Sequence, residues 1–378
     1  MTTFIDVHVL QTVPSSNLNR DDTGSPKSAT FGGVKRARVS SQAWKRATRR
    51  DFEAYLEDSD RGVRTRHIAE DLVKRIKGID DTISTEEALE LARKAFAPSG
   101  IKLAKPTRKK GEDDGRIDMD LSGYLVFASN QQLDALARVA VDGRGGDIDK
   151  AAAKAALKGG NGIEVALFGR MVADDTSYNV DAAVQVAHAI STHAVETEYD
   201  YFTAVDDAKP DEDDAGAGMI GVIEFNSSTL YRYATINLDQ FLENVGDAEN
   251  TARAVKAFVR SFVVSMPTGK LNTFANNTLP DAVLAQVRTR RPVNLVGAFE
   301  TPVAAKPGSS ISLQSAAELA RVARETDAAY GTEPSAAYVV ARGSDVGDVF
   351  AGCGERVDLA GLVEQVGERT VEALLERV

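Results

Sequence analysis

The stretch Val34–Arg50, VKRARVSSQAWKRATRR, places a short strand-like segment directly before a helix-like one. The first part, VKRARVS, resembles a strand in length and in its valines. A serine at position 40 or 41 can then cap a helix, because its hydroxyl accepts a hydrogen bond from a free backbone N–H of the first turn. The stretch therefore predicts a strand followed at once by a helix that starts at Ser40 or Ser41.

At 100° per residue, the two sides of this helix have different chemistry. One side is expected to pack against the core, and its members are Trp44, Ala47, Thr48 and Tyr55. The other side is polar and cationic, and its members are Gln42, Lys45, Arg46, Arg49 and Arg50. Asp51 falls near the packing side, where a carboxylate is expected to need a partner.

The basic residues of this region form a cluster in an acidic chain. From Lys27 to Arg50 there are eight Lys or Arg residues and no Asp or Glu, although the formal net charge is -11. Ammonium and guanidinium groups bind phosphates, and a helix N-terminus attracts anions as well. The cluster predicts binding to a string of phosphates; the alternative is a solvated cationic helix face.

Composition limits the class of protein. The chain has 378 residues, of which 43% are hydrophobic and 27% charged, values ordinary for a soluble globular protein. With one cysteine, Cys353, it can form no internal disulfide and no thiolate zinc cluster. No secretory signal is recognised at the start, and no apolar run reaches the ~18–20 residues that span a bilayer. We expect a cytoplasmic protein without membrane contact.

Strand and helix patterns alternate in mixed order, which predicts an α+β fold with an antiparallel sheet. Strands are expected over 4–10, 34–40, 121–129, 229–238, 281–289, 292–300 and 335–342, with a long hairpin over 199–228 that has an acidic tip. Helices are expected over 65–77, 84–96, 130–141, 149–158, 180–195, 238–245, 251–263, 313–326 and 357–378.

No residue pattern predicts a catalytic centre of a familiar kind. The four histidines match no metal-binding motif, and no Walker A, G-x-S-x-G or dinucleotide motif occurs in context. Asp206 and Asp207, near the hairpin tip, offer carboxylates for metal-assisted cleavage of a phosphodiester. The alternative is a solubilising tip. No cofactor and no metal are expected.

Four segments also resemble a known family. They are FIDVHVLQTVPSSNLNRDD (4–22), FGGVKRARVSSQAWKRATRR (31–50), AHAISTHAVETEYDYFTAVDD (187–207) and YRYATINL (231–238). Their order and spacing are similar to those of the backbone subunit of the type I-E CRISPR surveillance complex Cascade, the CasC family.

The resemblance implies a fold with three parts. It implies a modified RNA-recognition, ferredoxin-like palm, an inserted helical fingers domain and a protruding thumb β-hairpin. The expected boundaries are 1–58 for the first part of the palm, 59–180 for the fingers, 181–197 for a palm helix, 198–224 for the thumb and 225–378 for the second part of the palm.

The resemblance also implies RNA-binding residues, carried over position by position. In the palm these are Arg20, Lys27, Gln42, Lys45, Arg49 and Lys270. In the fingers loop they are Arg170 and Met171, the methionine being a wedge beside a displaced base. In the thumb they are Phe202, Thr203 and Val205. The segment around Lys270, PTGKLNTF, departs from the family run, and so does the acidic tip after Asp207.

The implied function is that of a non-catalytic scaffold. Copies of the chain polymerise head to tail along one CRISPR RNA, contact other Cascade subunits and present the guide for pairing with target DNA. The alternative functions are a metal-dependent target-RNA endonuclease that uses Asp206 or Asp207, and a nucleic-acid-binding module that acts alone.

Overall fold

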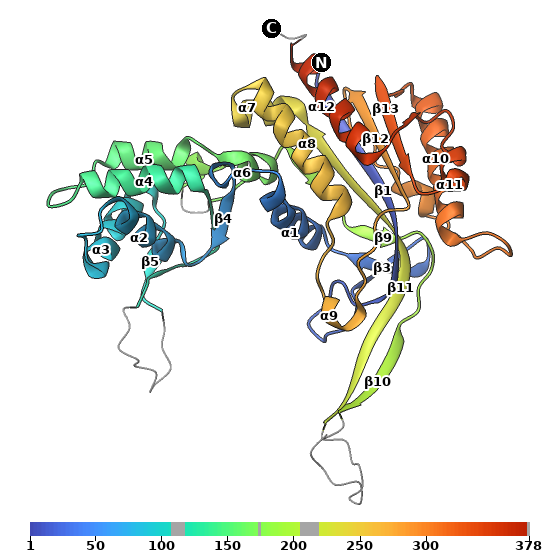
Figure 1. Ribbon diagram of the computed structural model, residues 1–378, viewed down its shortest axis with the longest axis horizontal. Coiled ribbons are helices and arrows are strands. Elements are labelled where there is room, and N and C mark those ends of the chain that lie inside the picture. Colours follow the sequence, from blue (N-terminus) through green and yellow to red (C-terminus); the bar gives the residue numbers. More distant parts are fainter. Residues whose placement is uncertain (107–117, 173–174, 205–218, 376–378) are drawn as a thin grey trace, which may run out of the picture. The chain divides into compact units, whose positions relative to one another are not determined.

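The computed structural model describes residues 1–106, 118–172, 175–204 and 219–375. The chain divides into two compact units. Unit 1 comprises Met1–Asp51, Gln185–Asn237 and Val255–Val378, and unit 2 comprises Phe52–Val184 and Leu238–Ala254. Figure 1 shows the elements of both.

Unit 1 is built on a long mixed sheet. Among the described residues, its main path has the order β14-β13-β12-β1-β11-β9-β3-β2, with β8 and β10 also paired to β11. The bounds are β1 Thr3–Ser16, β2 Ser28–Phe31, β3 Val34–Val39, β8 Val184–Val186, β9 Ala189–Ser191, β10 Glu198–Ala204, β11 Met219–Asn237, β12 Ala282–Thr289, β13 Ala336–Ala341 and β14 Glu355–Arg356. Only β13 and β14 pair in parallel among the strand pairs with a described register.

Helices cover both faces of the central part of this sheet, and there residues 5–11 of β1, 229–236 of β11 and 282–288 of β12 are buried on both sides. On one face Leu10 and Leu284 pack against Leu319 of α10 (Ile311–Tyr330), with α11 (Ser344–Val349) beside it. On the other face Tyr338 meets Arg369 of α12 (Leu359–Leu375), at 3.2 Å from the phenol oxygen. The later residues of α8 (Ala248–Val264) lie next to α12.

Unit 2 is mainly helical. It contains α2 (Ile68–Ile79), α3 (Thr85–Phe96), α4 (Asn130–Asp142), α5 (Lys150–Lys158), α6 (Gly162–Phe168), α7 (Leu238–Val245) and the start of α8. Two short ladders join β4 (Gly62–Thr65) to β7 (Val126–Ser129) and β5 (Leu103–Ala104) to β6 (Leu121–Ser122). Leu72, Phe96 and Leu136 lie in one buried cluster, as the amphipathic periodicity of α2, α3 and α4 requires.

The α+β class is confirmed, and so are most of the expected elements, including the helix that starts at Ser41. The expected helix over 180–195, taken as a palm helix over 181–197, is wrong. That segment forms β8 and β9, in which Ile190 pairs with Tyr231 on one side and with Arg38 on the other. Its β-branched residues find strand partners far away in the sequence, and this tertiary pairing outweighs the helix propensity of its alanines.

Two further expectations differ from the structure. The segment 292–300 was expected to be a strand, but it lies outside the sheet and holds the single 3-10 turn Val296–Phe299, because the buried Tyr231 hydroxyl and Asp6 carboxylate take its backbone N–H groups. The segment Leu238–Ala254, placed by the resemblance in the second part of the palm, lies with unit 2. There Asn244 donates to the backbone oxygens of Ala166 and Asp181 at 2.9 and 2.8 Å.

Candidate nucleic-acid interface

Helix α1 (Ser41–Asp51) carries the cationic residues that the sequence singled out. It follows β3 directly, and the Ser40 hydroxyl accepts a hydrogen bond from the backbone N–H of Ala43 at 3.3 Å. The backbone N–H of Ser40 is held in turn by the Asn19 side chain at 2.9 Å. The capping serine therefore also ties the helix to the loop that precedes β2.

The packing side of α1 rests on a buried arginine. Trp44, Ala47 and Thr48 are buried, whereas Tyr55 is 40% exposed, contrary to its predicted place in the packing face. The Arg232 guanidinium lies 3.8 Å from the centre of the Trp44 ring and donates to Gln11 Oε1 at 2.6 Å. Burial lowers the pKa of Arg232 to about 9, because the charged form is desolvated.

The other side of α1 is accessible to different degrees. Gln42, Arg46 and Arg50 are exposed, whereas Lys45 and Arg49 are half-buried. Arg36, which belongs to the same basic cluster in the sequence, is fully buried and donates to the backbone oxygens of Ser191 and Phe299, at 2.9 and 2.7 Å. Thus one of the eight clustered cations is structural.

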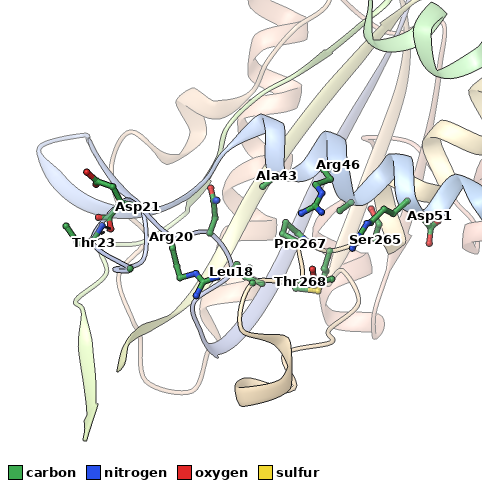
Figure 2. A pocket seen from close by; sticks show the side chains of 17 residues that line it. Leu18, Arg20, Asp21, Thr23, Ala43, Arg46, Asp51, Ser265, Pro267 and Thr268 are labelled. Atoms are coloured by element: carbon green, nitrogen blue, oxygen red, sulfur yellow. Dashed lines mark hydrogen bonds between the residues drawn. The ribbon is translucent and has the colours of Figure 1, made fainter. Parts of the chain in front are cut away.

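A cavity of about 930 Å³ lies beside α1, and we call it the α1 cavity. Its wall combines the loop Leu18–Gly24, the α1 residues Ala43, Arg46, Ala47, Arg50 and Asp51, and the segment Ser265–Gly269. Figure 2 shows Arg46 on α1 and Arg20 on the loop at this cavity. Of the predicted palm residues, the structure places Arg20 here, and it adds Arg46 and Arg50.

The loop that forms one wall is held in shape by short hydrogen bonds. The Asp21 carboxylate accepts from the backbone N–H groups of Thr23 and Ser25 at 2.9 and 3.0 Å. These hydrogen bonds, and above all the one from the Thr23 hydroxyl, lower the pKa of Asp21. In the same wall, Gly269 packs against this loop so closely that a Cβ at this position would lie 2.2 Å from the Leu18 carbonyl oxygen.

The remaining palm residues lie apart from the α1 cavity. Lys27 is half-buried and lines a small groove of about 20 Å³ with Arg38. Burial, with Arg38 and Lys27 nearby, lowers the pKa of His188. Lys270, at the start of α9 (Leu271–Phe274), has a φ of 46° and does not line the cavity, so the structure gives no reason to join it to the site.

The hairpin of β10 and β11 carries the predicted thumb residues. Phe202 pairs with Gly221, and its ring covers that glycine so closely that a Cβ there would lie 2.4 Å from a ring atom. Thr203 pairs with Ile220 in the register. Tyr201, which the prediction omitted, is 61% exposed. Val205, Asp206 and Asp207 lie outside the described residues.

In unit 2 the two residues of the predicted fingers loop have opposite environments. Met171 is 82% exposed, which is unusual for a large apolar side chain. Arg170 is only 8% exposed and donates to Tyr178 O at 2.8 Å and to Gln132 Oε1 at 2.9 Å. Burial lowers the pKa of Arg170 to about 10. This arrangement does not favour the predicted direct contact of Arg170 with RNA; instead, Arg170 anchors the loop that exposes Met171.

Three exposed residues of these surfaces, Arg46, Arg50 and Tyr201, were not among the predicted site residues. The helical wheel had placed the two arginines on the cationic side, 40° and 80° from Gln42, so their spacing carried the signal. The residue-by-residue resemblance passed over them. The sequence indicated Tyr201 less clearly. Side chains alternate between the two faces of a hairpin, and with Tyr201 on one face and Phe202 on the other the pattern does not show which face is solvated.

The described parts of the chain lack two other kinds of feature. No group of three or more His, Cys, Asp or Glu side chains there is placed to hold a metal ion. No helix among the described residues has the length and apolarity needed to cross a membrane.

This chain is similar to chains of solved structures and matches a protein family. A chain from a structure titled "CRISPR RNA-guided surveillance complex, pre-nicking" has 35% sequence identity and a TM-score of 0.85, over 97% of this chain and 100% of that chain. A chain from a "CRISPR RNA-guided surveillance complex" has 31% identity and a TM-score of 0.69, over 96% and 99%. No curated protein sequence matches. Since the model of the CT1975-like protein family matches residues 5–365, this chain belongs to that family.

Proposed function

We propose that this protein is a CRISPR RNA-binding backbone subunit of a type I-E Cascade complex, as in the CasC family. The observation that carries the proposal is the cationic side of α1, with Arg20 and Lys27 nearby, on a fold similar along its whole length to chains of RNA-guided surveillance complexes. Guanidinium groups bind phosphates without reading bases, and a guide of variable sequence requires binding of that kind.

Within this proposal, copies of the chain add head to tail along one guide. The palm of each copy binds phosphates through Gln42, Lys45 and Arg49 on α1 and through Arg20 and Lys27 nearby. The β10–β11 hairpin, the proposed thumb, reaches over the guide held by the next copy. A contact between two different surfaces continues into an open filament, so the number of copies follows the length of the RNA.

The exposed Met171 has a defined place in the proposal. An unbranched, polarizable side chain packs well against the face of a nucleobase, and here 82% of it faces solvent. We assign it the role of a wedge beside a base displaced at each kink, with Phe202 of the hairpin on the other side. The bases between kinks then remain free to pair with target DNA.

Assembly length is the direct test. The purified chain is mixed with single-stranded RNAs that increase in steps of a few nucleotides, and particle mass is measured by light scattering after size-exclusion chromatography. The proposal predicts that mass rises in steps of one protein chain as the RNA lengthens. A fixed complex of one chain with one RNA, whatever the RNA length, would support a binding module that acts alone.

The alternative of an RNA-cleaving enzyme rests on the carboxylates of Asp206 and Asp207. Incubation of the assembled protein with a complementary target RNA and Mg²⁺ tests it. We expect an intact target, since the proposed role is that of a scaffold in the cytoplasm with other Cascade subunits. Cuts at regular intervals that disappear in Asp206→Ala or Asp207→Ala would overturn the scaffold role.

A further inference from the structure

Three basic side chains meet on unit 1, and none of them lines the α1 cavity. Arg38 lies on β3, His188 directly precedes β9, and Lys27 directly precedes β2. The backbone N–H of Arg38 donates to the Lys27 oxygen at 2.9 Å, and Arg38 pairs with Ile190 in the ladder of β3 and β9. The sheet therefore brings these side chains together, and we call them the Arg38 cluster.

The contact between Arg38 and His188 determines which nitrogen of the imidazole carries a proton. Nη1 of Arg38 lies 3.2 Å from Nδ1 of His188. A guanidinium group can only donate, so Nδ1 is the acceptor and the neutral ring has its proton on Nε2. Burial, together with the charges of Arg38 and Lys27, lowers the pKa of His188, so the ring stays neutral at pH 7. The exposed His188 therefore offers an Nε2–H donor.

The Arg38 cluster has more donors than the described parts of the chain supply with acceptors. Nε of Arg38 donates to the backbone oxygen of Ser28 at 3.3 Å, and Nη2 has no partner there. The same holds for the Lys27 ammonium group and for Nε2 of His188. The groove beside Lys27 and Arg38, of about 20 Å³, holds little more than one water molecule. An anion that binds at the surface and accepts from all three side chains would offset the repulsion between the two cations.

A phosphodiester group matches this set of donors. Its two non-bridging oxygens accept charge-assisted hydrogen bonds from guanidinium and ammonium groups, and a neutral imidazole N–H can donate to the same oxygens. We propose that Arg38 and His188, together with Lys27, bind one backbone phosphate of the RNA at a site separate from α1. Arg38 supplies charge and also holds the His188 ring as a donor. This inference rests on the proposed RNA-binding function, in which Lys27 already binds phosphate.

Arg38 and His188 should affect RNA binding in different ways. The probe is oligouridylate without terminal phosphates, and its affinity for the full chain is measured by fluorescence anisotropy at four salt concentrations. Arg38→Gln removes a charge and one single-strand phosphate contact, so the slope of log affinity against log salt should decrease by about 0.7. His188→Ala removes a neutral donor to a charged group, so affinity should fall about tenfold while the slope stays unchanged.

Nitrogen NMR of the His188 ring tests the geometry without reference to affinity. Long-range ¹H–¹⁵N spectra distinguish protonated from unprotonated ring nitrogens. The chain has four histidines, so comparison with His188→Ala identifies the signals of this ring. At pH 7.5 we expect Nδ1 to be unprotonated and Nε2 to be protonated, and a short oligouridylate that binds a single copy should shift the Nε2 signal.

The control Lys306→Gln, at an exposed position of unit 1, should change neither slope nor affinity. If the unchanged chain does not bind oligouridylate, the RNA-binding function fails. If it binds, but either Arg38→Gln or His188→Ala behaves like the unchanged protein, the inference is overturned while RNA binding stands. A smaller slope for His188→Ala would contradict the neutral donor. Should Arg38→Gln not fold, the affinity of His188→Ala and the Nε2 signal decide.

Discussion

At the scale of single residues, α1 presents two rows of cations with different accessibility. Lys45 and Arg49 are half-buried and project with Gln42, whereas Arg46 and Arg50 are exposed at the α1 cavity. Both rows follow from a helix whose packing side is fixed by Trp44. In the proposed function, the first row binds phosphates.

The double variant Lys45→Ala/Arg49→Ala tests the first row. It should weaken RNA binding equally for all sequences, because phosphate contacts carry no base information. The slope of log affinity against log salt should decrease by about one to two units, since each lost single-strand phosphate contact removes about 0.7. Binding isotherms at four salt concentrations measure this slope.

The charge-matched control for that experiment is Arg290→Ala/Lys306→Ala, at two exposed positions of unit 1. It should leave the slope unchanged. Equal slopes for the α1 double variant and the unchanged protein would show that this row does not contact phosphates.

Met171→Ala tests the proposed wedge. Loss of an exposed thioether should change bulk RNA affinity less than twofold, yet the base at each kink should become less reactive toward single-strand chemical probes as it returns to the stack. Reactivity is mapped nucleotide by nucleotide on the assembled complex. An unchanged reactivity pattern would argue that Met171 is merely an exposed side chain.

At the scale of secondary-structure elements, Arg232 connects β11 with α1 and α8. Its guanidinium lies between the rings of Trp44 and Phe262, at 3.8 and 4.7 Å from their centres, and donates to carbonyl oxygens of Phe262 and Val263. Placement of the cationic side of α1 therefore depends on a buried arginine in a strand about 190 residues further along the chain.

Replacing Arg232 with methionine should destabilise unit 1 by about 3 kcal/mol, because Gln11 and two backbone carbonyls lose their donor inside the core. Trp44 is the single tryptophan of the chain, so urea unfolding followed by its fluorescence reports on α1 directly. The control Arg291→Met, at an exposed position, should change stability by less than about 0.5 kcal/mol. A similar small change for Arg232→Met would contradict the supporting role.

The β10–β11 hairpin offers a second test at this scale. A methyl group at position 221 would meet the Phe202 ring, so Gly221→Ala should displace that ring without disturbing the core of either unit. If the hairpin grips the guide of a neighbouring copy, the variant should form shorter assemblies on long RNA, with unchanged unfolding. Gly146→Ala, where a Cβ meets nothing within 4 Å, is the matched control. If Gly221→Ala still formed full-length assemblies, the position of the Phe202 ring would not matter for assembly.

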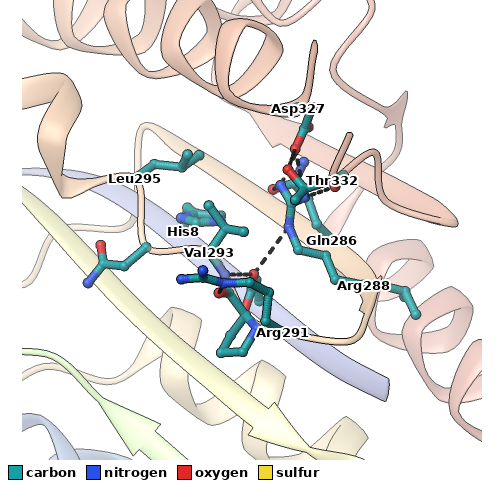
Figure 3. Close-up of polar contacts among 12 residues, drawn as sticks. His8, Gln286, Arg288, Arg291, Val293, Leu295, Asp327 and Thr332 are labelled. Carbon is teal, nitrogen blue, oxygen red and sulfur yellow. Dashed lines mark hydrogen bonds and ion pairs between the residues drawn. The ribbon is translucent and has the colours of Figure 1, made fainter. Parts of the chain in front are cut away.

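At the scale of the whole molecule, a buried polar network lies in the centre of the unit 1 sheet (Figure 3). Arg288 pairs with Asp6 at 3.2 Å and with Asp327 at 2.7 Å. His8 lies in the same strand as Asp6, 2.9 Å from the Tyr231 hydroxyl. Burial, with the Arg288 charge nearby, lowers the pKa of His8 to about 3.

This shift predicts how stability depends on pH. Below pH 6.5 the unfolded chain protonates His8 while the folded chain does not, so stability falls between about pH 6.5 and 3, by up to ~1.4 kcal/mol per pH unit. His8→Gln should therefore lower the free energy of unfolding most at pH 7.5 and progressively less toward pH 4.5, as measured by urea unfolding. A difference between the two proteins that does not vary with pH would mean that His8 titrates normally.

The elements of the molecule were more predictable than its site. Periodicity predicted α2, α3 and α10, since each buries one stripe of a helix against a single core. It failed over 180–195, where Ile190 is held by strands from distant parts of the chain. Spacing predicted the cationic side of α1. Spacing did not predict that Arg36 and Arg170 are buried. The backbone carbonyl groups that accept their hydrogen bonds come from distant segments, and only the fold brings them together.

The position of β1 in the sheet has a consequence for biosynthesis. Ile5 lies between Ile236 and Val287, so β1 leaves the ribosome before both of its neighbouring strands, which follow more than 200 residues later. Most of unit 2 lies between β1 and β11 in the sequence, so unit 2 can form most of its core before β1 finds its partner strands. At roughly 5–20 residues per second, the apolar residues of β1 wait unpaired for about ten seconds or longer. During that time the nascent chain needs protection from aggregation, and slower translation before residue 289 prolongs the need.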